Sequence, residues 1–384
     1  MMSKVYQIRR WALLLVSGFT IGLVSCQEEK DPDVRPLLNI PQVYDSVGYR
    51  FNSEPLQPLI QQFTSLVEEA RKGGQRGTYV SEESLNAAFT QGDFSLLSVT
   101  TPYYASRLQA QNNGFFAELS KASGGTFYPF DRSWEGGVYG SYLFDEYGLE
   151  MGQMIEKGMY GAALYNYALS LTKGTFTPAT ADQILYVYGA SPMFYNSDNG
   201  TNYQNPDRLM AAYAARRDDA TGTGLYSQNR LAFITLQAAL QEGEDYNTYR
   251  DEALAAIKLN WEKINAATVI NTIHASTSIL NSTSLTEQQR ADVLHLISEA
   301  AGFLHGWRTI DAGNKKITDN QIDELLTLLN APYDRSASVY RFVTNTAEEL
   351  PKLSQAVARI QGIYGFTNEE VESFRRNYVA DQAR

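Results

Sequence analysis

Apolar residues recur at steps of three and four along much of this chain, and this spacing limits the possible folds more than any other feature. In residues 55–72 the apolar positions are Leu56, Leu59, Ile60, Phe63, Leu66, Val67 and Ala70. Such steps place one apolar stripe along a helix. Residues 147–172, 251–267 and 291–307 are also helix-like, whereas strand-like alternation is scarce. The pattern predicts an all-α protein built from packed helical bundles.

Four short strings mark expected helix starts. Each places a threonine three residues before a glutamine or glutamate, which is the spacing of a capping box. In a capping box the two side chains satisfy backbone N–H groups that the first helical turn leaves free. The strings begin at Thr180, Thr286, Thr318 and Thr367, and each precedes an apolar-periodic run.

Two stretches interrupt the helical pattern. Residues 124–148 are rich in glycine and aromatic residues, and residues 196–224 are rich in Asn, Asp and Gly. The second stretch lies near the middle of the chain and is the predicted junction. It would join an N-terminal helical bundle, residues 46–195, to a C-terminal helical bundle, residues 225–384.

The first 26 residues have the organisation of a bacterial lipoprotein signal. A basic start precedes an uncharged apolar stretch, residues 11–24. That stretch is shorter than the roughly 20 residues of a membrane span and suits a secretory signal peptide, residues 1–25. Leu23-Val-Ser-Cys26 resembles a lipobox, and Cys26 is the only cysteine. We expect a lipid on Cys26; the alternative is a plain signal peptide with a chance cysteine.

Residues 26–45 are expected to form a lipidated tether. They are polar and contain Pro32, Pro36 and Pro41, which favours an extended spacer. The acidic residues directly after Cys26 resemble the tag that directs some lipoproteins to the outer face of the outer membrane. The sequence therefore predicts an outer-membrane lipoprotein of the cell envelope. Its expected partner is the membrane itself, to which the lipid would anchor it.

Net charge limits the other partners. The chain has 32 Lys and Arg against 43 Asp and Glu, a net charge of −11, and loss of the three basic residues in the first 25 would make it −14. So acidic a chain repels nucleic acid, and no nucleic-acid partner is expected. With Cys26 lipidated, no cysteine remains for a disulfide or for thiol catalysis.

Few residues can carry chemistry. The histidines are His274, His295 and His305, and the sequence has no HExxH, GxSxG, Walker or dinucleotide motif. His295 and Glu299 are four residues apart and would share a helix face, so they are candidate ligands of one metal ion. The alternative is that Glu299 supports His295 inside a bundle core.

Glu156 and the aromatic stretch supply the remaining candidates. Glu156 lies beside Lys157 in an otherwise apolar helix. A buried carboxylate there would need a partner and would be a third candidate metal ligand; the alternative is an exposed carboxylate on the polar side. Trp134 and Tyr139 would stack on sugar rings or line a ligand groove, unless these rings only pack a long loop onto the domain.

Five strings extend this interpretation. They are Tyr49-Arg-Phe51, Glu150-Met-Gly-Gln-Met-Ile-Glu-Lys-Gly-Met-Tyr-Gly-Ala162, Trp261-Glu-Lys-Ile-Asn-Ala-Ala267, His295-Leu-Ile-Ser-Glu-Ala-Ala-Gly-Phe303 and Ile322-Asp-Glu-Leu-Leu326. In content and order they resemble the imelysin-related family of bacterial lipoproteins of unknown function. The resemblance implies two related helical bundles formed by internal duplication. A weak repeat agrees with this, because similar apolar-apolar-glycine steps end at Gly189 and Gly302.

Imelysin-like proteins are implicated in iron uptake at the cell envelope and were first classed as metallopeptidases, with a GxHxxE motif as their marker. This chain lacks the motif, since only Glu156 of Met151-Gly-Gln-Met-Ile-Glu156 matches it. The closer family tends to carry a His-x-x-x-Glu-Ala-x-Gly pattern in each half. That pattern is present from His295, while residues 180–183 occupy the comparable region of the first half without it. These departures argue against peptidase activity and an intact metal site.

The expected function is therefore a non-enzymatic binding role in the envelope, in the acquisition of iron or another nutrient. One alternative is a metal-dependent hydrolase of the imelysin type, with a metal ion held by His295, Glu299 and Glu156. Another is a glycan-binding surface lipoprotein that uses the Trp134 region.

Overall fold

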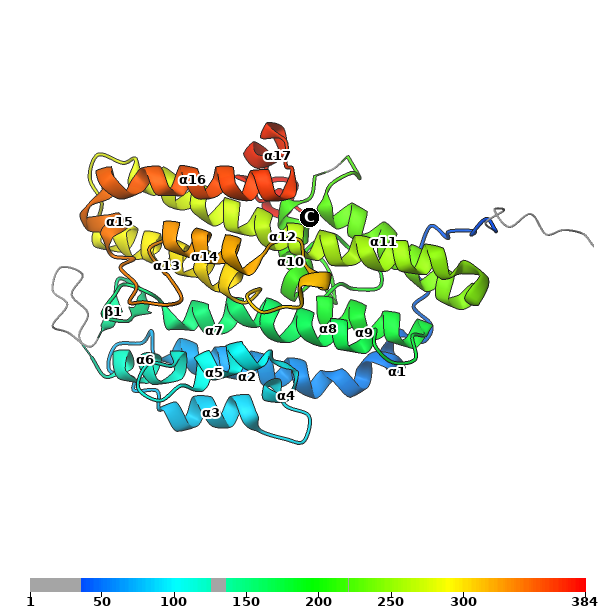
Figure 1. Ribbon diagram of the computed structural model, residues 1–384, viewed down its shortest axis with the longest axis horizontal. Coiled ribbons are helices and arrows are strands. Elements are labelled where there is room, and N and C mark those ends of the chain that lie inside the picture. Colours follow the sequence, from blue (N-terminus) through cyan, green and yellow to red (C-terminus); the bar gives the residue numbers. More distant parts are fainter. Residues whose placement is uncertain (1–35, 126–135, 220) are drawn as a thin grey trace, which may run out of the picture. The chain divides into compact units, whose positions relative to one another are not determined.

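Helices dominate the structure, a computed structural model that describes residues 36–125, 136–219 and 221–384 (Figure 1). The all-α prediction is confirmed, because the only sheet in these residues is a two-stranded hairpin. The elements up to residue 188 are α1 (Tyr49–Ser53), η1 (Glu54–Leu56), α2 (Gln57–Lys72), α3 (Glu82–Thr90), α4 (Leu96–Val99), α5 (Pro102–Gln109), α6 (Phe115–Ser123), β1 (Gly137–Tyr139), β2 (Tyr142–Phe144), α7 (Met151–Met159), η2 (Tyr160–Tyr165), α8 (Asn166–Leu171) and α9 (Pro178–Tyr188).

The second part of the chain contains the longest helices. Its elements are α10 (Leu209–Arg217), α11 (Leu225–Glu242), η3 (Glu244–Tyr246), α12 (Asn247–Leu280), α13 (Glu287–His305), η4 (Ala312–Asn314), α14 (Asp319–Leu328), α15 (Arg341–Thr344), α16 (Thr346–Tyr364), α17 (Asn368–Ser373) and α18 (Tyr378–Asp381). The strands β1 and β2 pair antiparallel, with Val138 opposite Leu143.

Three of the four predicted capping boxes are present. Thr286, Thr318 and Thr367 cap α13, α14 and α17, each with the residue three positions on completing the box. The fourth prediction is wrong, because α9 begins earlier and its capping box joins Thr177 to Thr180. Proline at position 178 explains the shift, since proline favours the first helical position.

The predicted helix of residues 147–172 is present from Met151 onward, but it is not uniform. It consists of α7, a π-helical turn η2 and α8 in direct succession. Asp145 orders the turn that precedes it, because its Oδ1 accepts hydrogen bonds of 2.8 Å from the backbone N–H groups of Tyr147 and Leu149. π-Helical turns inside α-helices are frequent near functional sites.

Helix α7 lies between two groups of helices. In Figure 1, α2 and α6 lie on one side of the row formed by α7, α8 and α9, and α13 lies on the other. Helices α11 and α12 pack against each other along much of their length, and α12 also contacts α13. Helix α7 therefore contacts helices from both predicted halves of the chain.

One continuous core joins the two predicted halves. Tyr165 lies 4.4 Å from Trp307 and 5.3 Å from Trp261, measured between ring centroids, and both tryptophans are almost fully buried. Residues 38–384 form one compact unit. The predicted bundles thus share their interior rather than forming separate cores.

The predicted junction and tether differ from the structure at two places. Residues 196–224 include the helix α10, whose Met210, Ala211 and Ala214 are fully buried; its alanines favour helix and pack closely. Residues 38–45, expected in the spacer, instead pack on the protein, because Leu38 and Tyr44 are both 5% exposed.

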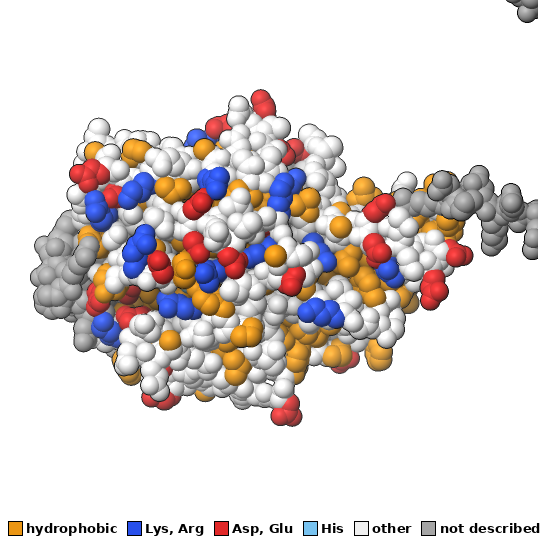
Figure 2. Space-filling model, in the orientation of Figure 1, with side chains coloured by type: hydrophobic (Ala, Val, Ile, Leu, Met, Phe, Trp, Pro, Cys, Tyr) orange, Lys and Arg blue, Asp and Glu red, His pale blue; other side chains and the backbone are white. Residues whose placement is uncertain are grey.

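The lipoprotein signal, Cys26 and Trp134 lie outside the described residues. Within the described ranges, no helix has both the length and the apolar character needed to cross a membrane. On the face seen in Figure 2, acidic and basic side chains are interspersed.

Candidate functional site

A cavity of about 400 Å³ opens beside α2, β2, α7 and α13, and we call it the α7–α13 pocket. Its charged and polar lining includes Arg71 of α2, Ser141 and Tyr142 at β2, Glu150, Gln153, Glu156 and Lys157 at α7, and His295 and Glu299 of α13. The three residues predicted as metal ligands therefore line one cavity, although they come from opposite predicted halves.

Glycines allow α7 and α13 to approach closely. At Gly302 an added Cβ would lie 2.6 Å from the backbone oxygen of Gln153, and at Gly306 it would overlap the carbonyl group of Gly158. Backbone atoms cannot rotate away as side chains can, so glycine is required at both places. The helix contact that forms the pocket thus explains Gly302, the glycine of the His-x-x-x-Glu-Ala-x-Gly pattern.

A buried lysine joins the charged groups of the pocket. The Lys157 side chain is 7% exposed, and its Nζ lies 2.8 Å from Glu156 Oε1, 2.8 Å from the Tyr213 hydroxyl and 3.8 Å from Glu299 Oε1. Burial alone would lower the pKa of Lys157, but Tyr213, Glu299 and Glu156 outweigh burial and raise that pKa well above its usual value. Lys157 is therefore a cation throughout the physiological pH range.

Glu156 is buried, so the alternative of an exposed carboxylate is wrong. The residue is 6% exposed, and its two oxygens are bound separately. Oε1 accepts a hydrogen bond from Lys157 at 2.8 Å, and Oε2 accepts one from Arg71 at 2.7 Å. Burial would raise the pKa of Glu156, but the two cations outweigh burial and lower it.

His295 is held by Glu150 rather than by Glu299. Its Nδ1 lies 2.6 Å from Glu150 Oε2, and its ring stacks on Tyr142 with 4.2 Å between centroids. The alternative in which Glu299 holds His295 by a hydrogen bond is therefore wrong, because Glu299 contacts Lys157 and Tyr213 instead. A carboxylate bound to Nδ1 fixes the ring orientation and leaves Nε2 as the second ring nitrogen.

Gln153 supplies an unusual acceptor. It is 7% exposed and lines the pocket, and within the described part of the chain its Oε1 has no hydrogen-bond partner. Buried side-chain oxygens are ordinarily hydrogen-bonded. The neighbouring Gly152 also lines the pocket, and a Cβ added there would meet only Glu150 Oε1, at 3.8 Å.

The three candidate metal ligands line one cavity, but they are not arranged as a metal site. Glu156 would have to release Arg71 or Lys157 before it could bind a metal ion. In the described ranges, no group of three or more His, Cys, Asp or Glu side chains is arranged to hold one. His295, Glu299 and Glu156 thus come together as part of a charged, hydrogen-bonded lining.

The two aromatic candidates for ligand binding, Trp134 and Tyr139, have different outcomes. Trp134 falls among the residues that the structure does not describe. Tyr139 lies in β1, is partly buried against the core and is not among the residues lining the pocket. Among the aromatic residues of this stretch that the structure describes, Tyr142 lines the pocket, and its hydroxyl donates to Asp292 at 3.2 Å.

His305 lies buried at the end of α13. It is the last residue of α13, directly before Gly306, and is 2% exposed. Its Nε2 lies 2.8 Å from the Tyr103 hydroxyl. Burial and the nearby arginines lower the pKa of His305 to about 3, so the imidazole stays neutral and acts in packing.

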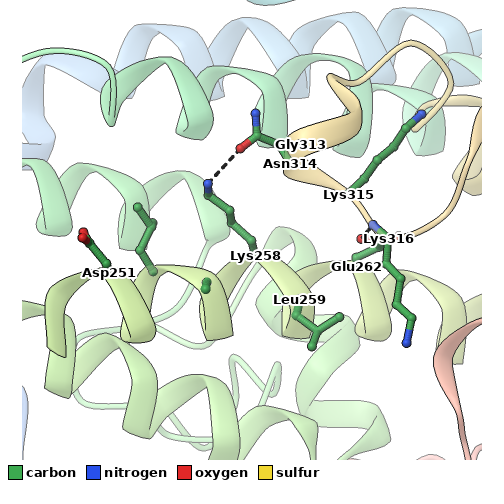
Figure 3. Close-up of a pocket in the computed structure, with 10 residues that line it drawn as sticks. Asp251, Lys258, Leu259, Glu262, Gly313, Asn314, Lys315 and Lys316 are labelled. Carbon is green, nitrogen blue, oxygen red and sulfur yellow. Dashed lines mark hydrogen bonds between the residues drawn. The ribbon is translucent and has the colours of Figure 1, made fainter. Parts of the chain in front are cut away.

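A second cavity, of about 440 Å³, lies between α12 and the loop around η4 (Figure 3). Several of its polar groups already have partners. Glu262 accepts hydrogen bonds of 2.7 Å from the backbone N–H groups of Lys316 and Ile317, and Lys258 donates to Asn314 at 2.8 Å. These contacts attach the loop to α12, so we regard the lining as structural.

His295→Ala is expected to lower the melting temperature, and by more at about pH 5.5 than at about pH 8.5. Burial lowers the pKa of His295, but the hydrogen bond and charge of Glu150, together with Glu299, outweigh burial and raise it. Protonated His295 thus stabilises the fold below the unfolded pKa of about 6.5, and this contribution is lost as pH rises through the folded pKa. Removing the partner of Glu150 adds a cost of about 1–3 kcal/mol.

Melting curves of the wild type and His295→Ala at both pH values, with and without chelator, measure this effect. His274→Ala serves as the control, because His274 lies outside the pocket lining. If chelator destabilised the wild type as much as the substitution does, the result would contradict this role and favour a metal site.

The sequence was also compared with known proteins. No protein-family model matches it, and the searches of curated proteins and of solved structures gave no significant match.

Proposed function

We propose that this chain is a lipid-anchored binding protein of the cell envelope and that it holds a small polar ligand in the α7–α13 pocket. The carrying observation is the set of charged side chains that line one cavity, among them Arg71, Glu156, Lys157, His295 and Glu299. A few charged and polar groups that converge on a cavity are typical of sites that fix the orientation of a small polar ligand.

The size of the pocket supports this proposal. Small-molecule sites typically enclose roughly 300–1,000 Å³, and the cavity of about 400 Å³ falls in that range. Gly152 is the second residue of α7, directly after Met151. No close packing neighbour would obstruct a Cβ at this position, so the glycine serves to leave room in the cavity.

The charged groups favour binding over catalysis. Lys157 has a raised pKa and remains protonated, so it is neither a nucleophile nor a general base. Glu156 is neutralised by two cations and has a lowered pKa, which makes it a poor proton donor. Such groups are suited to fixing the orientation of a polar ligand.

One observation favours a hydrolase as the second candidate. Glu150 fixes His295 through Nδ1, which is how a general base is oriented with Nε2 free to accept a proton. In this alternative His295 would activate a water molecule in the pocket. Hydrolysis of peptide or ester substrates by the wild type, lost in His295→Gln, would replace the binding proposal with this one.

The cellular location is proposed from the N-terminal sequence and from the family resemblance. Cys26→Ala is expected to release the protein from the membrane fraction, because the lipid on this thiol would be its anchor. Fractionation of cells that express each form measures the change. Persistence of the variant in the membrane fraction would contradict lipid anchoring. A role in nutrient acquisition, with iron as one candidate, rests on the resemblance alone.

Gly152→Leu is expected to abolish ligand binding while the protein remains folded. The leucine side chain would extend into the cavity, and replacing a helical glycine offsets part of any local strain. Thermal-shift measurements with panels of amines, carboxylic acids, sugars and iron chelates would compare the wild type with this variant. Gly362→Leu is the matched control, because a Cβ at this exposed position of α16 meets nothing within 4 Å.

The control should retain every ligand that the wild type binds. Ligands that stabilise Gly152→Leu and the wild type equally would place binding outside the α7–α13 pocket. If no compound on the panel stabilised the wild type, the proposed binding of a small polar ligand would be contradicted.

A further inference from the structure

A further cavity, of about 640 Å³, opens beside α1, the end of α9 and the loop that joins α9 to α10, and we call it the α1–α9 cavity. No residue lines both this cavity and the α7–α13 pocket. In Figure 1, α1 and α9 lie at one end of the row formed by α7, α8 and α9, and β1 lies at the other. The α1–α9 cavity is therefore a separate place at which a ligand could bind.

The loop of residues 189–208 forms much of the cavity wall and contains no helix or strand. Loops longer than roughly 12–15 residues without secondary structure are usually functional or disordered. This loop is fixed at both ends, because the backbone N–H of Arg208 donates to the carbonyl oxygen of Gly189 at 2.8 Å. Asp207, which is 1% exposed, also accepts a hydrogen bond of 2.9 Å from the backbone N–H of Ser191. An ordered loop of this length favours a functional role.

Two bulky residues beside the cavity have a left-handed backbone. The angle φ is 48° at Phe194 and 50° at Leu209, which is rare for large side chains. Such strain persists only where the surrounding contacts impose it, and it clusters at functional sites. Phe194 lies between the lining residues Met193 and Tyr195, and Leu209 directly follows Arg208. The strain therefore lies next to the cavity wall.

The charged residues that line the cavity are both basic. They are Arg50 and Arg208, and no Asp or Glu is among the lining residues, all of which the structure describes. This is unusual in a chain whose net charge is −11. Both arginines are exposed, and neither guanidinium group has an ion-pair or hydrogen-bond partner in the described residues. Both are therefore free to bind an anion.

The acidic residues near the cavity do not line it. Asp182 and Asp207 act electrostatically on Tyr49 of the wall, but they are only 2% and 1% exposed. Both oxygens of each accept hydrogen bonds from the protein. Glu54, one turn after Arg50, is exposed and forms no ion pair with it. An anion in the cavity would therefore meet arginines and no carboxylate of the lining.

Aromatic rings and amide groups also line the cavity. The rings are those of Tyr49, Tyr186 and Tyr195, and the amides are those of Gln57, Gln204 and Asn205. An aromatic ring has a negative face, against which the apolar C–H face of a sugar ring packs. Amide side chains both donate and accept hydrogen bonds, as sugar hydroxyl groups do. These groups favour a hydroxyl-rich ring compound over a simple anion.

We propose that the α1–α9 cavity binds an acidic oligosaccharide, with a uronate carboxylate on Arg208 and a sugar ring on Tyr186. This site goes beyond the binding proposed for the α7–α13 pocket and does not rest on it. A guanidinium group matches a carboxylate through two parallel hydrogen bonds. The guanidinium carbon of Arg208 lies 5.6 Å from the centroid of the Tyr186 ring, so one sugar unit can make both contacts.

Four probes separate the contribution of the charge from that of the sugar. Trigalacturonate and trimannuronate are the uronates, the methyl ester of trigalacturonate keeps the sugar without the charge, and tricarballylate carries three carboxylates without a sugar. In calorimetric titrations of the wild type at about pH 7, we expect at least one uronate to bind about tenfold or more tightly than the ester. Tricarballylate should be weaker by a similar factor, because it has no ring to pack on Tyr186.

Three variants assign the contacts. Arg208→Gln should weaken uronate binding by about tenfold or more and leave binding of the ester nearly unchanged. Tyr186→Leu keeps an apolar side chain without the aromatic face, and it should weaken the uronate and the ester alike. Arg359→Gln is the matched control for charge, because Arg359 is 45% exposed and lies outside the cavity lining; binding should be unchanged. Melting curves would establish that the variants are folded.

The outcomes separate this inference from the proposed function. Equal binding of uronate and ester, or an unchanged affinity in Arg208→Gln, would overturn the carboxylate contact. Tricarballylate that binds as tightly as the uronates would overturn the saccharide assignment, and failure of both uronates to bind would overturn the whole inference. Gly152→Leu should bind uronates as the wild type does; loss of binding there would place the uronate in the α7–α13 pocket, which supports the proposed function and overturns this site.

Discussion

Lys157→Ala is expected to reduce the free energy of unfolding by about 3–5 kcal/mol, the usual effect of removing one partner from a buried ion pair. The Lys157 ammonium group contacts Glu156 at 2.8 Å and Glu299 at 3.8 Å, and all three side chains are largely buried. Without Lys157, Glu156 keeps only the solvent-exposed Arg71, and Glu299 keeps a long contact to Tyr213. The cost therefore comes mainly from carboxylates that are left without a buried partner.

This effect should be nearly constant between about pH 6 and pH 9. Glu156 has a lowered pKa, so its stabilising charge is present above its unfolded value of about 4.5 and is lost only as pH falls through the folded pKa. Lys157 has a raised pKa, so its contribution is complete below about 10.5 and is lost only as pH rises through the folded pKa. Both charges are present across the interval.

Denaturant unfolding of the wild type, Lys157→Ala and Lys72→Ala would measure the difference. Lys72 is the matched control, because its side chain is 58% exposed and its ion pair with Glu69 lies on the surface of α2; loss of such a pair costs at most about 1 kcal/mol. Combining Lys157→Met with Glu156→Gln should recover part of the loss. Equal effects of the substitutions at positions 157 and 72 would contradict a buried ion cluster.

Local features of the fold could be predicted from the sequence because their causes are local. The capping boxes at Thr286, Thr318 and Thr367 each involve two residues three positions apart. The shared face of His295 and Glu299 likewise follows from one helical turn. The start of α9 was predicted wrongly because two adjacent threonine-based boxes compete, and Pro178 favours the earlier one.

The rest of the pocket depends on contacts between distant parts of the chain. Arg71 and Glu156 are 85 residues apart, and Glu150 and His295 are 145 residues apart. No periodicity links such positions, so the sequence offers His295 only a partner on its own helix, Glu299, one turn away. The sequence indicates Lys157 only as a neighbour of Glu156, although Lys157 contacts groups from three helices.

Composition also gave a wrong prediction for the segment before residue 45, where a few side chains determine whether the chain packs on the protein. The polar, proline-containing segment before residue 45 resembles a spacer, yet Tyr44 is buried and its hydroxyl donates to Asp182 at 2.6 Å. Leu38 packs against Ala238 and Ala239 of α11. Two apolar side chains that find buried sites are enough to order a short segment.

Gly306→Ala is expected to destabilise the protein by at least about 1–3 kcal/mol, the range for overpacking a close-packed interior. The added Cβ would overlap the carbonyl oxygen and carbon of Gly158. Backbone strain at position 306 itself is not the cause, because its φ of −62° and ψ of −21° suit alanine. The cost arises because α13 and the end of α7 would have to move apart.

That displacement should also weaken the pocket. The His295–Glu150 and Lys157–Glu299 contacts both join the α7 region to α13, so separating the two helices lengthens both. Gly306→Ala should therefore bind any ligand of the α7–α13 pocket more weakly than the wild type does, even at temperatures where it remains folded.

Gly362→Ala is the control for the loss of a glycine. A Cβ at this exposed helical position meets nothing within 4 Å, so alanine should stabilise the protein by roughly 0.5–1 kcal/mol through helix propensity. Opposite signs for the two substitutions, measured by denaturant unfolding, would show that the helix contact and not the general cost of replacing glycine determines the effect. A neutral Gly306→Ala would contradict the close approach of α7 and α13, and with it the geometry on which the pocket depends.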